Sequence, residues 1–145
     1  MNKPFLALVF LVLGVYGTAQ NLSKKESRMV FEIDFQDFFN SDTISLRVND
    51  CINFKNIVLT SNKSTGLTDK IFKGYTYGKD QVIIFFKGSS NICNYSTNQI
   101  FLFISLNGEE KKYTIDIRKG SYLGFSKKGN DNLTFLQSIT PFQYD

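Results

Sequence analysis

The segment of residues 100–117, IFLFISLNGEEKKYTIDI, holds an Asn107-Gly108 pair between two runs that alternate like β-strands. Asn-Gly favours a type I′ turn, because that turn needs positive φ at both central residues. The pair therefore predicts a hairpin with a two-residue loop. Its register puts four apolar side chains on one strand face, which we expect in the core: Ile100, Leu102, Tyr113 and Ile115.

Short strand-like runs separated by polar turns make up most of the remaining chain. We expect these runs at residues 29–36, 43–49, 51–60, 70–77, 81–87, 122–126 and 133–138. The run 51–60 changes its inward face near Lys55-Asn56, which predicts a β-bulge there. The run 81–87 is apolar on both faces, so we place it centrally, covered on both sides and followed by a loop at residues 88–91.

This pattern predicts an all-β fold, an antiparallel β-sandwich of about nine short strands, immunoglobulin-like in its general form. A closed β-barrel is the alternative. Residues 114–122, TIDIRKGSY, resemble the strand-turn-Gly-x-Tyr segment of prealbumin-like sandwich modules of bacterial surface proteins. The resemblance is confined to that segment, implies a prealbumin-like sandwich as the other form, and carries over no functional residues.

The N-terminal residues have the pattern of an export signal. Lys3 precedes an apolar run at residues 5–15, and small residues follow up to Ala19. These features predict a signal peptide at residues 1–19, cleaved near Ala19, since the apolar run is shorter than the about 20 residues that span a bilayer. We then expect a loose tail at 20–28, a single domain at 29–145 with no membrane span, and secretion or a periplasmic location.

Cys51 and Cys93 are the only two cysteines of the chain. An even count in an exported protein predicts a disulfide between them, with two buried thiols as the alternative. The loop-entropy estimate for the roughly 43 residues that such a bond closes gives about 4 kcal/mol of stabilisation.

The composition excludes several kinds of chemistry. The chain has no histidine and no tryptophan, so histidine-dependent catalysis, histidine-bound metals and tryptophan stacking of sugars are absent. No phosphate-binding loop or cofactor motif occurs, and we expect no metal and no cofactor. Arginine is scarce and lysine is scattered, which argues against a nucleic-acid partner. Acids such as Asp34 and Asp37, or Asp42 and Asp50, remain as candidates for a carboxylate pair.

Aromatic residues are the most unusual feature, at 15% of the chain. Phe101 and Phe103 lie on the hairpin face opposite Leu102, so they are either covered by the C-terminal tail at Phe142 and Tyr144 or exposed as an interface. Tyrosines suit binding surfaces because one end is apolar and the other forms hydrogen bonds. The candidate ligand-binding residues are therefore Tyr75, Tyr77, Tyr95, Phe101 and Phe103.

The sequence thus favours a non-catalytic binding or adhesion module at the cell envelope or outside the cell, with a protein or glycan as ligand. One alternative is a structural subunit that assembles through edge strands such as residues 43–49. Another is a small carboxylate-dependent hydrolase.

Overall fold

A computed structural model of the chain describes residues 27–95, 98–130 and 132–144. The predicted signal peptide and most of the predicted tail lie outside the described residues. Arg28, at the end of that tail, is tied to the domain: its N–H donates to Thr76 Oγ1 at 2.9 Å and its carbonyl accepts from the Thr76 N–H at 2.8 Å.

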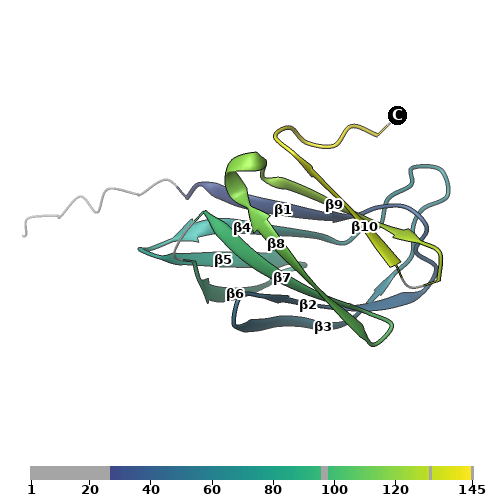
Figure 1. The fold of residues 1–145 in the computed structure, drawn as a ribbon, viewed down its shortest axis with the longest axis horizontal. Coiled ribbons are helices and arrows are strands. Elements are labelled where there is room, and N and C mark those ends of the chain that lie inside the picture. The colour runs from purple at the N-terminus through teal and green to yellow at the C-terminus, as the bar shows by residue number, and fades with distance from the viewer. Residues whose placement is uncertain (1–26, 96–97, 131, 145) are drawn as a thin grey trace, which may run out of the picture.

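The described residues form two sheets that pack face to face (Figure 1). The six-stranded sheet has the order β10-β9-β1-β4-β5-β6, and the four-stranded sheet has the order β3-β2-β7-β8. The predicted sandwich is confirmed, and the sheets do not close into the alternative barrel. The strands are β1 (Met29–Phe35), β2 (Asp42–Val48), β3 (Cys51–Leu59), β4 (Ile71–Tyr77), β5 (Gln81–Phe86), β6 (Ser89–Asn94), β7 (Gln99–Leu106), β8 (Glu109–Asp116), β9 (Tyr122–Lys128) and β10 (Asn132–Ser138).

The pairing is antiparallel except between β1 and β9, which run parallel. The parallel pair arises where the chain leaves β8 in one sheet, passes through the 3-10 turn η1 (Ile117–Lys119), and enters the other sheet as β9. No helix of the described residues is long and apolar enough to cross a membrane.

The predicted hairpin is confirmed residue by residue. Leu102 pairs with Tyr113 and Ile100 with Ile115, as the two-residue loop requires. Asn107 has a φ of 50° and Gly108 a φ of 96°, both positive as a type I′ turn needs. The other predicted irregularity is also present, since the register of β3 against β2 shifts at the expected bulge, where Asn56 has a φ of 55°.

Two predictions for residues 81–94 are wrong. Strand β5 is next to the edge rather than central, and its outer face is open, with Phe85 43% exposed. Residues 88–91 are not a loop: Lys87 and Gly88 have positive φ values of 44° and 79°, make a two-residue turn, and lead directly into β6. A short turn of this kind needs no loop, so the chain resumes pairing at Ser89.

The prediction of a free edge at residues 43–49 is wrong as well. Strand β2 is paired on both sides, with β3 and with β7. Its alternation of buried and exposed residues reports which face is buried but not which strands lie beside it. The edges of the two sheets are β10, β6, β3 and β8.

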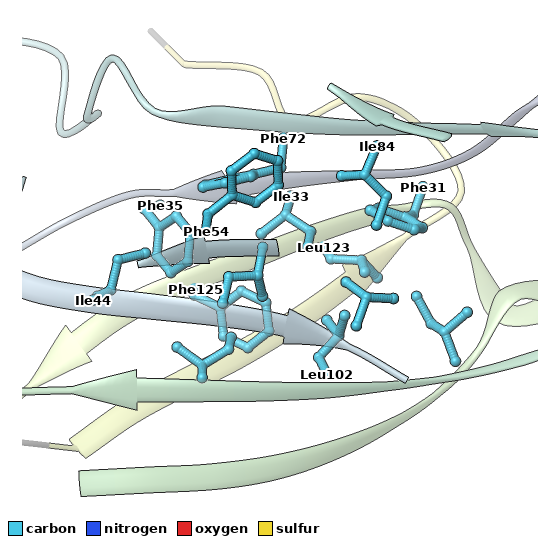
Figure 2. Close-up of a cluster of buried hydrophobic side chains, with 14 of the residues drawn as sticks. Phe31, Ile33, Phe35, Ile44, Phe54, Phe72, Ile84, Leu102, Leu123 and Phe125 are labelled. Atoms are coloured by element: carbon cyan, nitrogen blue, oxygen red, sulfur yellow. The ribbon is translucent and has the colours of Figure 1, made fainter. Parts of the chain in front are cut away.

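The core between the sheets is rich in phenylalanine (Figure 2). The ring centres of Phe35 and Phe125 are 5.8 Å apart, and those of Phe54 and Phe72, from opposite sheets, are 5.1 Å apart. Gly74 interrupts β4 for a packing reason, since a Cβ at this position would lie 2.6 Å from the ring of Phe31. The glycine thus leaves room for a large buried ring on the neighbouring strand.

Candidate binding surface

Phe101 and Phe103 lie on the outer face of the four-stranded sheet. Both belong to β7, in which Ile100, Leu102 and Ile104 point into the core and are fully buried. The alternation of a strand therefore turns both phenylalanines outward, two residues apart on one face. Each is half-buried rather than covered.

Two cationic side chains lie over these rings. The guanidinium carbon of Arg47 is 3.6 Å from the centre of the Phe103 ring, and Lys112 Nζ is 4.3 Å from that of Phe101. The ladder explains the arrangement, because Phe103 pairs with Arg47 on β2 and with Lys112 on β8. Such cation–π contacts contribute about 0.5–1 kcal/mol at exposed sites. We call these four residues the aromatic–cation face.

The guanidinium of Arg47 is held in place from two further sides. One nitrogen donates to the carbonyl of Asn49 at 3.3 Å, and another donates to Glu110 Oε1 at 3.2 Å. The Arg47 side chain is 29% exposed, so part of its guanidinium still faces solvent beside Glu110. A planar, pre-oriented guanidinium is the group that best recognises a carboxylate by two hydrogen bonds.

Two hollows flank the aromatic–cation face. One, of about 170 Å³, lies between Phe103 and the start of the β3 bulge and includes Ser45, Lys55 and Glu110 in its lining. The other, of about 400 Å³, lies beside Phe101 and is lined by polar groups that include Asn49, Asp50, Asn94 and Gln99. The face is thus a pair of half-buried rings with a hollow beside each, and this mixture of apolar and polar groups is typical of an interface.

Of the two alternatives for Phe101 and Phe103, cover by the C-terminal tail is wrong. The tail packs on the other sheet, where Gln36 Nε2 donates to the Tyr144 hydroxyl at 2.8 Å. The ring of Phe142 lies within 3.0 Å of the position that a Cβ on Gly124 would take. The tail therefore covers β1 and β9, and the aromatic–cation face is open.

The three candidate tyrosines lie elsewhere. Tyr75 and Tyr77 are in β4, the strand expected at residues 70–77, and point outward from the six-stranded sheet, where the Tyr75 ring centre is 6.0 Å from that of Phe85. Tyr95 follows β6 and packs partly against the core, and this burial raises its pKa. The structure therefore brings together only Phe101 and Phe103 of the five predicted residues.

The candidate carboxylates do not form a catalytic pair around either flanking hollow. Asp34 is 6% exposed under the C-terminal tail, and Asp42 is 5% exposed beside Lys127. Asp37 lines a separate hollow of about 270 Å³ with Phe38 and Lys63, where no second carboxylate joins it. No group of three acids or cysteines among the described residues is arranged to hold a metal ion.

Replacing Asp34 with asparagine is expected to stabilise the protein above pH 6. Burial, and then the charge of Glu32, raise the pKa of Asp34 from its ordinary 3.8 to about 6, against the opposing charge of Lys73. A neutral Asp34 therefore favours the folded state below about pH 4, and this contribution is lost as the pH rises through about 6. We expect Asp34→Asn to gain about 2 kcal/mol in urea unfolding at pH 8 and nothing at pH 4. Asp80→Asn, at an exposed turn, is the control, and an equal gain at both pH values for Asp34→Asn contradicts the assignment.

Sequence reasoning missed Arg47, which belongs to the aromatic–cation face, and Glu110, which pairs with it. Lys112 could be placed because the hairpin register puts it opposite Phe103. Arg47 reaches the same ring only through the pairing of β2 with β7, which no local pattern predicts. Glu110 could be identified only once Arg47 was placed, because it contacts the surface through its ion pair with the Arg47 guanidinium.

No protein-family model, curated protein or solved structure matches this chain. The function therefore has to be inferred from the chemistry of the surface.

Proposed function

We propose that this protein is an exported, non-catalytic binding module that recognises an acidic segment of a protein partner through the aromatic–cation face. The observation that carries the proposal is the guanidinium of Arg47, held 3.6 Å over the Phe103 ring by a side chain that is still 29% exposed. Binding surfaces often combine an exposed aromatic centre with an oriented arginine, since both lose little entropy on contact.

Charge supports an acidic ligand. Arg47, Lys55 and Lys112 contribute three positive charges to the face and its hollows, whereas Glu110 and Asp50 contribute two negative ones. A ligand carboxylate that accepts from Arg47 beside Glu110 adds a charge-assisted hydrogen bond, and apolar ligand groups gain contact with the two half-buried rings.

The same geometry disfavours a neutral glycan. Sugars stack on the flat face of an aromatic ring, and here cationic side chains lie over that face of Phe101 and Phe103. A sugar would have to displace both cations before stacking. A protein segment that presents carboxylates meets the cations directly.

The proposed location is outside the cytoplasm, after cleavage near Ala19. The disulfide between Cys51 and Cys93 supports an oxidising compartment, because such bonds persist in exported proteins and are rare in the cytosol. The charged start, apolar run and small residues of the first nineteen positions support export.

The test is a titration with a peptide that alternates glutamate and leucine, followed by the backbone NMR signals and by calorimetry. We expect shifts in β2, β7 and β8 around Arg47, Phe103 and Lys112. Because a hydrogen bond between charged groups contributes about 1.5–3 kcal/mol, Arg47→Gln should weaken binding by about tenfold or more.

Arg118→Gln is the matched control. Arg118 is also an exposed arginine paired with a carboxylate, that of Asp116 at 2.8 Å, but it lies away from the aromatic–cation face. An equal loss in both variants would show non-specific attraction and contradict the site. Binding of neutral dextran to the same strands would contradict the acidic-protein class, and binding of polygalacturonate in preference to the peptide would replace it with an acidic glycan.

A further inference from the structure

The four edges of the two sheets differ in how they are protected. An unprotected edge strand is a template for another strand, and proteins guard such edges with bulges, charges or covering groups. Strand β3 carries the bulge at Asn56 together with Lys55. Strand β8 is guarded by charge, with five charged residues: Glu109, Glu110, Lys111, Lys112 and Asp116.

Strand β6 is guarded by the opposite sheet. The disulfide joins Cys93 of β6 to Cys51 of β3, and Asn49 Nδ2 donates to the carbonyl of Asn94 at 2.7 Å. The side of β6 that faces away from β5 is thus covered at its C-terminal end. Three of the four edges therefore carry a recognisable guard.

Strand β10 has no bulge, charge or disulfide of its own, and a charged side chain contacts it at its first residue, where Lys111 Nζ of β8 donates to Asn132 Oδ1 at 2.6 Å. Its sequence, NLTFLQS, contains no charged residue and no proline, and its register with β9 runs without a shift. Leu136 is 59% exposed, and Ile139, just beyond the strand, is 77% exposed. The C-terminal tail turns inward over β1 and β9 and leaves the edge of β10 uncovered. Figure 1 shows β10 at the outer border of the sheet, beside β9.

The ladder shows which backbone groups of β10 point away from the sheet. The carbonyls of Ser121 and Phe125 accept from β1, so the odd-numbered residues of β9 face β1 and the even-numbered ones face β10. Gly124 pairs with Leu136, so the even-numbered residues of β10 face β9. The groups that face outward belong to Leu133, Phe135 and Gln137, and no other strand of the described part of the chain pairs with them.

We infer that β10 pairs antiparallel with β10 of a second copy of this chain, about a two-fold axis at Phe135. This axis sets Phe135 against its equivalent and Leu133 against Gln137 of the copy, so every outward backbone group meets a partner. When a strand pairs with its own copy, any charged residue near the axis faces the same charge on the copy, and the two repel each other. Strand β10 has no charged residue, so its self-pairing meets no such repulsion.

The side chains suit the same axis. On the outer face, Leu136 would lie beside Thr134 of the copy and lose its exposed apolar surface. On the inner side, Phe135 is 36% exposed at the open flank of the sandwich, where its ring centre is 5.9 Å from that of Tyr113. A second Phe135 across the axis would cover that flank. The two six-stranded sheets would then run on as one sheet through the interface.

The test measures the mass of the protein by analytical ultracentrifugation, from about 10 μM to about 1 mM, the range in which weak specific association is populated. We expect a monomer–dimer equilibrium, with amide exchange at Leu133, Phe135 and Gln137 slowing as the concentration rises. Leu136→Lys should weaken the dimer by about tenfold or more, because it places two new charges at the pairing. At the lowest concentration, where the monomer dominates, its melting temperature should match that of the wild type, since Leu136 is exposed.

Val58→Lys is the control, because Val58 is 52% exposed on β3, an edge that the bulge protects. This variant should dimerise like the wild type. A monomer at every concentration overturns the inference. So does a dimer that Leu136→Lys leaves intact or whose protected amides lie on another strand, because β10 would then not be the contact.

Discussion

Replacing Lys127 with methionine should destabilise the fold by about 3–5 kcal/mol, because it leaves a buried carboxylate without its cation. Lys127 belongs to β9 of the six-stranded sheet, and its Nζ lies 2.7 Å from Asp42 Oδ1 at the start of β2 in the other sheet. The same carboxylate accepts from Asn107 Nδ2 and from the Asn40 N–H, each at 2.8 Å. The ion pair therefore joins the two sheets and the Asn107-Gly108 turn. Urea unfolding at pH 7 measures the loss.

The pH dependence of this loss has a definite sign. Burial opposes ionisation of Asp42, but the hydrogen bonds from Lys127, Asn107 and Asn40 outweigh it and lower the pKa of Asp42. The ionised form thus favours the folded state above the ordinary pKa of aspartate, and this contribution is lost as the pH falls through the lowered pKa. The deficit of Lys127→Met should shrink in acid, since a protonated carboxyl needs no cation.

Two variants separate the ion pair from general effects of removing a charge. Lys128→Met, at the adjacent exposed position, should change stability by no more than about 0.5 kcal/mol. The double variant Asp42→Asn with Lys127→Met should recover much of the loss, because no buried charge is left without a partner. A loss in Lys127→Met that persists at low pH, or that the double variant does not reduce, contradicts an electrostatic origin.

The parts of the fold that depend on neighbouring residues could be predicted from the sequence. Asn107-Gly108 sets its own turn geometry, so the register of β7 against β8 follows from two residues. The slip of the apolar pattern near Lys55-Asn56 likewise marks the bulge, because an inserted residue reverses the face on which later side chains lie. These features need no information about the rest of the molecule.

The order of strands could not be predicted in the same way. Alternation along residues 43–49 shows a buried face, but an inner strand and an edge strand can have the same pattern. The neighbours of β2 are fixed by pairings with β3 and β7, and the pairing with β7 joins residues more than fifty positions apart. The apolar run of β5 indicated burial on both faces, yet no layer formed by the described residues covers its outer face, and Phe85 is exposed.

The candidate site shows the same division. The alternating pattern correctly predicted that Phe101 points away from the core. Tyr75 also points outward, but from the opposite sheet. Which residues share a surface therefore depends on sheet membership, and sheet membership depends on long-range pairing. Arg47 illustrates the consequence, because its contact with Phe103 exists only where β2 lies beside β7.

Removing the disulfide is expected to lower the free energy of unfolding by about as much as Lys127→Met does. Cys51 begins β3 and Cys93 lies in β6, so the bond joins an edge of each sheet across a sequence separation of 42. The disulfide closes a loop and so limits the conformational entropy of the unfolded chain; without the bond, that entropy increases. The double variant Cys51→Ser with Cys93→Ser should therefore lose about 4 kcal/mol of stability. Urea unfolding of this variant and of the wild type gives the difference.

The unfolded-state origin of this effect can be separated from damage to the folded core. Cys93 is 1% exposed, so a serine hydroxyl at this position adds a cost of its own. Cys51→Ala with Cys93→Ala avoids that cost, and wild type unfolded in a thiol reductant removes the bond without any substitution. Both should approach the same loss. If reduction leaves the stability unchanged while the serine variant falls, the two edges are held by packing and by the Asn49–Asn94 hydrogen bond, and the disulfide adds little.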